Sequence, residues 1–99
     1  MSVFVVAQGR IEDRNKIDEY VAKIMPTMKG SGGRLLGFDE TPDMIEGEVS
    51  HPRTVIAEFP SKEAFQKWYD SDAYQAILSL RLEGAPGTMI LVDGFPPAS

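Results

Sequence analysis

The segment SVFVVAQGRI, residues 2–11, decides the fold that this sequence predicts. Residues with β-branched or other apolar side chains fall on both of its alternating faces, and Phe4 and Val6 lie opposite Val3 and Val5. An antiparallel strand with one face in water would instead alternate apolar and polar residues. We therefore expect a first strand here whose two faces are both covered.

A helix is expected directly after this strand. Apolar residues recur at the three- and four-residue spacings of a helix face, at Ile17, Tyr20, Val21, Ile24 and Met28. Asp13 is suited to cap the helix, because its carboxylate can accept hydrogen bonds from free N–H groups of the first turn. Pro26 lacks an N–H and crowds the preceding turn, so we expect the helix to kink or break near Met25.

Three further extended segments are expected in the middle of the chain, at residues 34–40, 44–49 and 53–59. A turn at residues 41–43 separates the first two segments. Residues 50–52 are predicted to join the last two segments in a hairpin of local register.

The second helical region is expected in two pieces. Ser61 caps the first piece, and a polar break at residues 70–72 starts the second. The inward-facing residues are Ala64, Phe65 and Trp68 in the first piece, and Tyr74, Ile77, Leu78 and Leu82 in the second. Gly84 and Pro86 end the helix, and residues 88–93 form the last strand.

The order of elements is β-α-β-β-α-β, the ferredoxin-like arrangement of an α+β fold. Its antiparallel sheet carries two helices on one face, so the helices of one chain leave the other face uncovered. The strands at residues 53–59 and 88–93 are also largely apolar on both faces. We therefore predict a homodimer, an α+β barrel in which two such sheets enclose the interior. The domain is predicted to span residues 1–95, followed by a short tail at residues 96–99.

The composition argues against several classes of protein. A chain of 99 residues with 42% hydrophobic and 25% charged residues is typical of one globular domain. The net charge of -5, without a run of Lys or Arg, argues against nucleic acid and anionic membranes as partners. The absence of cysteine excludes thiol nucleophiles and thiolate metal sites. Without a membrane-spanning stretch or a signal peptide, a cytoplasmic location is expected.

Several short motifs together resemble one family. They are Glu46-Gly47, Pro52-Arg53, EFPS at residues 58–61, WYxSxxY at residues 68–74, and Arg81. This combination is similar to the family called domain of unknown function 1330, within the dimeric α+β barrel superfamily, over nearly the whole chain. The resemblance implies a ferredoxin-like homodimer. It implies no particular reaction, because the superfamily includes cofactor-free monooxygenases, haem-degrading enzymes and isomerase-like proteins.

His51 is the first candidate for acid–base chemistry, because its side chain alone has an ordinary pKa near neutrality. Its place before Pro52 in a predicted turn is equally typical of an exposed histidine without a role. A single histidine cannot build a two-histidine metal set, so we expect no metal site. An axial haem ligand needs only one histidine, which leaves haem binding open.

Arg53 and Glu58 lie at the two ends of one predicted strand. Their separation of five residues places them on opposite faces, so each needs its own partner. In the predicted hairpin, Glu48 would be the diagonal neighbour of Arg53. Glu58 is expected to pair with Arg81 on the last helix, or else to act as an acid or base that faces a ligand.

Trp68 and Tyr74 flank the polar break in the second helical region. Both positions continue helix faces that are expected to pack into the core. An apolar ring with a polar tip is also suited to the wall of a ligand pocket. Both interpretations remain open from the sequence.

Ligand binding without turnover is the function we expect, with a small apolar or aromatic metabolite as the ligand and no cofactor. The candidate ligand-binding residues are Arg53, Trp68, Tyr74 and Arg81. The enzymatic alternative is a cofactor-independent monooxygenase or isomerase that uses a cavity between the two sheets, with His51 or Glu58 as base and Arg53 as an anion clamp. A haem-handling protein with His51 as ligand is a third possibility.

Overall fold

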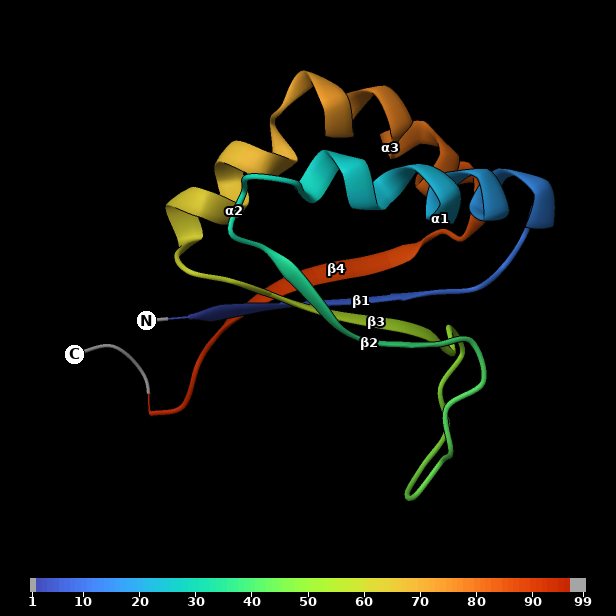
Figure 1. The fold of residues 1–99 in the computed structure, drawn as a ribbon. Helices are drawn as coiled ribbons and strands as arrows, with labels where there is room; N and C mark the ends of the chain where they lie inside the picture. The colour runs from blue at the N-terminus through green and yellow to red at the C-terminus, as the bar shows by residue number, and fades with distance from the viewer. Residues whose placement is uncertain (1, 97–99) are drawn as a thin grey trace.

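An antiparallel sheet of four strands carries three helices on one face in the computed structural model, which describes residues 2–96 (Figure 1). The elements follow in the order β1 (Val3–Gly9), α1 (Arg14–Met28), β2 (Arg34–Asp39), β3 (Arg53–Phe59), α2 (Lys62–Tyr69), α3 (Asp72–Gly84) and β4 (Gly87–Asp93). The α+β ferredoxin-like fold is therefore confirmed, with the second helical region in two pieces. Of the predicted tail, residues 97–99 lie outside the described residues.

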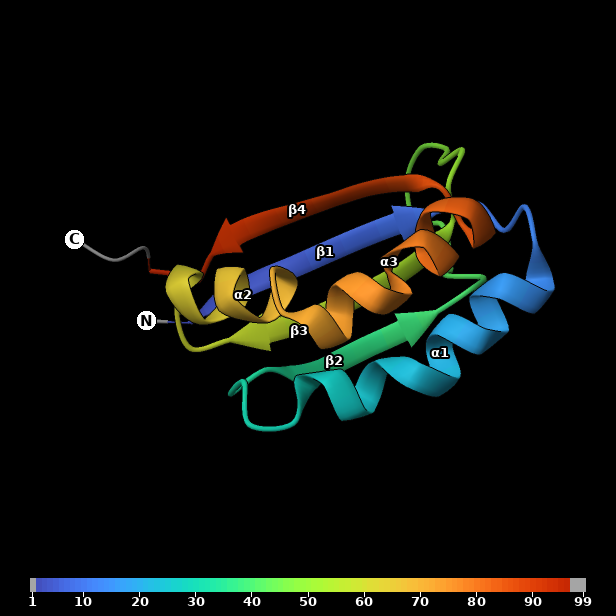
Figure 2. The same cartoon turned by 90° about the horizontal axis from the view of Figure 1, so that it is seen from above.

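The strand order β2-β3-β1-β4 places β1 and β3 in the middle of the sheet. Val5 pairs with Ala57 on one side and with Leu91 on the other, so the side chains of these three residues share the face that the helices cover. Seen from above, α2 and α3 lie over β1 and β3, whereas α1 runs along the β2 side of the sheet (Figure 2).

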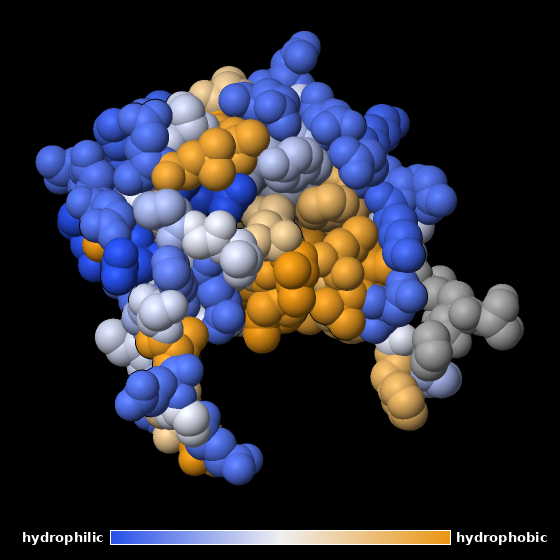
Figure 3. Space-filling view, turned by 180° about the vertical axis from the view of Figure 1, so that it is seen from behind, coloured by the Kyte–Doolittle hydropathy of each residue, from blue (hydrophilic) through white to orange (hydrophobic). Residues whose placement is uncertain are grey.

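The opposite face of the sheet, here called the open face, carries no helix (Figure 1). Its apolar residues in the two central strands and β4 are Phe4, Val6, Ile56, Ile90 and Val92. Ile56, Ile90 and Val92 are 38%, 55% and 42% exposed. Apolar side chains also gather along the lower part of the molecule in Figure 3. One chain thus leaves apolar sheet surface uncovered, so the cover predicted for both faces of residues 2–11 is not complete within a single chain.

The predicted caps begin all three helices. The Asp13 carboxylate accepts a hydrogen bond from the Lys16 N–H (3.2 Å). The Ser61 hydroxyl accepts one from the Ala64 N–H (3.0 Å). Ser71 does the same for the Tyr74 N–H (3.2 Å), which explains why the polar break separates two helices.

Pro26 does not break α1 near Met25, contrary to the prediction. The helix continues through Pro26 to Met28. The proline stands only two residues before the end of the helix, so the perturbation is confined to the last turn. The Thr27 hydroxyl also donates to the Ile24 carbonyl oxygen at 2.6 Å, which adds a hydrogen bond to this turn.

The predicted hairpin between residues 44–49 and 53–59 is wrong. Residues 44–49 form no strand, and β2 itself pairs with β3. Because β1 occupies the other edge of β3, no edge remains for a further strand. Residues 40–52 instead form a loop that projects from the end of the sheet (Figure 1). Glu48 is therefore not a strand neighbour of Arg53.

The inner face of α3 differs from the prediction at one position. Leu82 is 51% exposed, whereas the buried residues of this helix are Tyr74, Ile77, Arg81 and Gly84. These positions follow spacings of three, four and three residues, which is the core-facing stripe of a helix. An arginine therefore stands where the hydrophobic pattern had placed a leucine.

Gly84 allows α3 to approach the start of α1 closely. A Cβ atom at this position would lie 2.7 Å from the backbone nitrogen of Ile17. We expect Gly84→Ala to lower the free energy of unfolding by about 1–3 kcal/mol, because backbone atoms cannot yield as a side-chain tip can. Urea denaturation measures this change. Ser79→Ala, at an exposed position of α3, is the control, and an equal effect of both changes would contradict the close packing.

Candidate functional site

A pocket lies between the helices and the covered face of the sheet. Its cavity has a volume of about 100 Å³. Val5 and Ala57 contribute to its floor from the central strands, and Ile24 and Met28 contribute to its wall from α1. The lining is predominantly apolar, as is typical of sites for small organic molecules.

The mouth of the pocket opens between α1 and β2. Four apolar residues that line the pocket are also 38–53% exposed: Val21 and Met25 of α1, and Leu35 and Phe38 of β2. Figure 2 shows α1 beside β2 along this edge of the molecule. The pocket is therefore accessible from solvent through an apolar rim.

Two arginines are buried in this pocket. Arg53, the first residue of β3, is 4% exposed, and Arg81 of α3 is 7% exposed. Both line the cavity. Both Nε atoms are fully buried and have no hydrogen-bond partner among residues 2–96, where neither arginine forms an ion pair. Unpaired buried charges of this kind are expensive and uncommon in proteins.

The surroundings of Arg53 disfavour its charge. Burial is the largest effect and lowers the pKa of Arg53. Charge interactions with Tyr20 and Glu40 oppose this shift in part, and the smaller effect of Arg81 adds to it. The ring of Phe38 lies 4.9 Å from the Arg53 Cζ atom, measured to the ring centroid, which provides a cation–π contact. This contact offsets only part of the cost of desolvation, because a ring face accepts no strong hydrogen bond.

A pair of tyrosines lies beside the two arginines. The hydroxyl oxygens of Tyr20 and Tyr74 are 2.9 Å apart, in a buried hydrogen bond. Burial raises the pKa of Tyr20, and the contact with Tyr74 adds to this effect. The phenol of Tyr20 therefore stays protonated near neutral pH and acts as a hydrogen-bonding group. Tyr20 lines the pocket, whereas Tyr74 stands behind Trp68, with ring centroids 4.0 Å apart.

Trp68 has both roles that the sequence left open, core packing and a position in the pocket wall. It is 5% exposed and packs against Phe59, with ring centroids 5.3 Å apart. Its Nε1 donates a hydrogen bond to the Thr27 hydroxyl at 3.1 Å. The same ring lines the cavity. Trp68 is thus a core residue with one surface toward the pocket.

The predicted pair between Glu58 and Arg81 is wrong. Glu58 accepts a hydrogen bond from Arg34 Nε of the neighbouring strand at 2.7 Å, and this bond lowers the pKa of Glu58. Side chains alternate along β3, so Glu58 points to the open face while Arg53 points to the helices. Arg81 lies on the helix side of the sheet, out of reach of Glu58.

His51 lies in the loop between β2 and β3 and does not line the pocket. Its Nδ1 is 2.8 Å from the Ser50 hydroxyl. The roles of His51 and Glu58 as bases stay predictions. Within residues 2–96, no group of three or more His, Cys, Asp or Glu side chains is placed to hold a metal ion.

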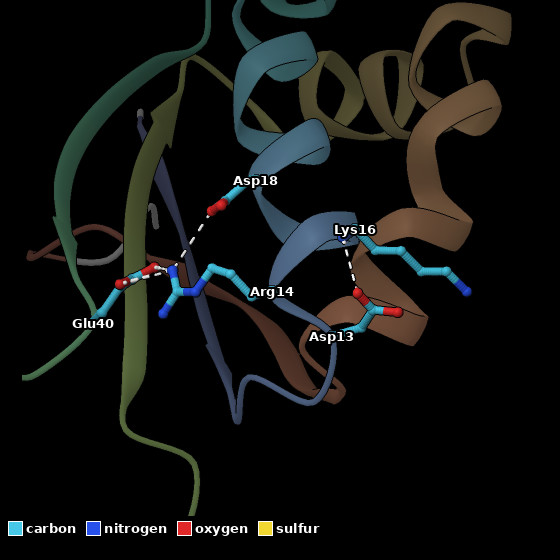
Figure 4. Close-up of polar contacts among 5 residues, drawn as sticks. All are labelled: Asp13, Arg14, Lys16, Asp18 and Glu40. Atoms are coloured by element: carbon cyan, nitrogen blue, oxygen red, sulfur yellow. Dashed lines mark hydrogen bonds and ion pairs between the residues drawn. The ribbon is translucent and has the colours of Figure 1, made fainter.

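The carboxylate of Glu40, the residue directly after β2, is bound by Arg14 of α1. Its carboxylate accepts from Arg14 Nη1 at 2.9 Å, and Arg14 also contacts Asp18 at 3.5 Å (Figure 4). Figure 4 also shows Asp13 turned to the backbone of Lys16 at the start of the helix. Glu40 is therefore ion-paired with Arg14, and its charge acts on Arg53 only from a distance, without an ion pair.

Sequence reasoning missed two residues of the site, Tyr20 and Phe38. Tyr20 was expected only on the apolar face of the first helix and Phe38 was given no role, yet both line the pocket. A signal for Tyr20 existed in principle, because it is the one hydroxyl-bearing residue in the inner stripe of α1. Phe38 carried no such signal, since its contact with Arg53 depends on the pairing of β2 with β3.

These features define a ferredoxin-like α+β domain with an apolar open face and a separate helix–sheet pocket. The chain belongs to the family described as domain of unknown function (DUF1330), which it matches over residues 2–95. No protein with a curated function matches the chain. None of the helices in residues 2–96 has the length and hydropathy needed to cross a membrane.

Solved structures share the fold at low sequence identity. A protein of unknown function from Rhodopseudomonas palustris is 17% identical with a TM-score of 0.79, covering 97% of this chain and 84% of that one. An EthD family protein from Bacillus halodurans is 16% identical with a TM-score of 0.66, covering 96% and 99%. A dimeric ferredoxin-like protein of unknown function from Thermobifida fusca is 14% identical with a TM-score of 0.60, covering 93% and 88%.

The two arginines should weaken the fold in the absence of a ligand. We expect Arg81→Met to raise the free energy of unfolding by about 1–4 kcal/mol, because methionine keeps apolar packing and removes a buried unpaired charge. Chemical denaturation without added anions measures the change. Arg10→Met, at an exposed arginine outside the pocket, is the control and should have little effect. A large loss of stability in Arg81→Met would contradict the unpaired state.

Proposed function

We propose that the protein binds a small apolar or aromatic molecule in the pocket between the helices and the sheet. The main support is the apolar cavity, whose exposed apolar rim is formed by α1 and β2. An apolar rim in contact with water is costly unless a ligand or partner covers it. The ferredoxin-like fold itself adds no preference for a reaction.

Three of the residues predicted to bind a ligand line this pocket, namely Arg53, Trp68 and Arg81. Tyr74 supports them from behind, through its contact with Trp68 and its hydrogen bond to Tyr20. The pocket is distinct from the cavity between two sheets that the enzymatic alternative uses. Glu58 faces that other side of the sheet, so ligand binding in the pocket needs no contribution from it.

Trp68 is the only tryptophan and provides a direct optical signal. Titration with benzyl alcohol, benzamide and benzoate should give a saturable change in its fluorescence for at least one compound. Phe38→Ala should weaken that binding about tenfold, or about 1.4 kcal/mol, because it removes an aromatic ring from the rim. Ile45→Ala, at an exposed position in the loop, should leave binding unchanged. No saturable response to any of the three compounds would refute this proposal.

We also propose that the open face joins two copies of the chain in a homodimer. Ile56, Ile90 and Val92 expose apolar surface there, and the similar protein from Thermobifida fusca is described as dimeric. Burial of two such faces against each other would remove this surface from water.

A charge on the open face should separate the two copies. Light scattering should give the wild type a mass near twice the 10.9 kDa of one chain, and Ile90→Glu a mass near that of one chain. Leu82→Glu, on the exposed side of α3, is the matched control and should stay dimeric. A monomeric wild type at micromolar concentration would contradict the dimer.

A further inference from the structure

We propose that the ligand of this pocket is an organic carboxylate, with its charged oxygens held by Arg53 and Arg81 and its apolar body held by the rest of the lining. This inference rests on the proposed function of the same pocket and specifies the chemical class of the ligand. The evidence for this class of ligand is the pair of guanidinium groups. They come from two different elements, β3 and α3, and line the same cavity.

The hydrogen-bonding groups of the pocket are nearly all donors. Each guanidinium has five N–H donors and no acceptor. The Tyr20 hydroxyl, which lines the pocket, can donate or accept and is already hydrogen-bonded to Tyr74. No Asp, Glu or His of residues 2–96 lines the cavity. A complementary ligand must therefore bring acceptors, and an ionised carboxylate is an acceptor-only group with two oxygens.

The charge of the pocket points to an anion rather than a neutral carbonyl compound. Two positive charges in one apolar cavity repel each other more strongly than they would in water. The lowered pKa of Arg53, caused mainly by burial and in smaller part by Arg81, is consistent with this geometry. A neutral acceptor would satisfy N–H groups without balancing either charge. An anion does both, through short charge-assisted hydrogen bonds.

No carboxylate of the described residues forms an ion pair with either arginine. Glu58, once the expected partner of Arg81, is held by Arg34 on the open face. Glu40, at the end of β2, is held by Arg14. Arginines buried only to stabilise a fold are normally found with an acid or several carbonyl acceptors. The arrangement is therefore that of a binding site in which the ligand supplies the negative charge that balances the two arginines.

The remaining lining favours an organic anion over an inorganic one. Trp68, Phe59 and Met28 present ring and thioether surface to the cavity, and these groups cannot replace the water around a phosphate. A cavity of about 100 Å³ with an apolar rim suits a single ring or a short chain. Benzoate is a suitable probe, because benzamide has nearly the same shape without the charge.

The test compares benzoate, benzamide and inorganic phosphate by Trp68 fluorescence and by the shift in melting temperature. Benzoate should bind at least tenfold more tightly than benzamide, and phosphate should not bind. Arg53→Met and Arg81→Met should each remove the preference for benzoate while still binding benzamide, and Arg81→Lys should restore part of it. Arg10→Met, outside the pocket, should retain the full preference.

Other binding results would overturn the carboxylate assignment, the proposed function, or both. Equal binding of benzoate and benzamide would leave the proposed function standing and overturn the carboxylate assignment. Binding of phosphate as tight as that of benzoate would overturn the organic part of the assignment. No binding of any probe would overturn both. Unchanged benzoate preference in both methionine variants, with these variants folded by circular dichroism, would also overturn the role of the two arginines.

Discussion

Two guanidinium groups buried without an acceptor are the constraint on which the rest of this structure depends. A buried charge without a partner costs free energy, and a domain of this size has only a small margin of stability. Arg53 and Arg81 occupy positions that a hydrophobic residue could fill, one facing the helices from β3 and one on the inner stripe of α3. The presence of two arginines at these positions is explained if a ligand supplies a negative charge to pair with them.

The fold leaves these two charges without an ion pair among the described residues, although the charge of Glu40 still acts on Arg53. Strand alternation sends Glu58 to the open face, and the start of α1 engages Glu40 through Arg14. Caps at Asp13, Ser61 and Ser71 fix the three helices over the sheet. The pocket is thus an apolar space with a concentrated positive end, while the surface pairs its acids and bases with each other.

The fold could be predicted from the sequence because it depends on local patterns. Runs of β-branched and other apolar residues placed β1 and β3, and the helical spacing of apolar residues with serine and aspartate caps placed the helices. The hairpin at residues 44–49 failed because strand pairing depends on which edges of the sheet are free. Arg81 was predicted to bind a ligand, but its predicted pairing with Glu58 was wrong. The face of the sheet on which Glu58 lies, relative to the helices, is set by the tertiary structure. Tyr20 and Phe38 were missed for the same reason, since the pocket exists only once α1, β2 and β3 lie together.

An anion that bridges Arg53 and Arg81 would complete the pocket. A crystal structure of the protein grown with benzoate tests this most directly. The benzoate carboxylate should lie within about 2.7–2.9 Å of guanidinium nitrogens of both arginines, with its ring against Trp68. Benzoate bound elsewhere, or an acid of a second copy of the chain paired with the two arginines in place of a ligand, would contradict it.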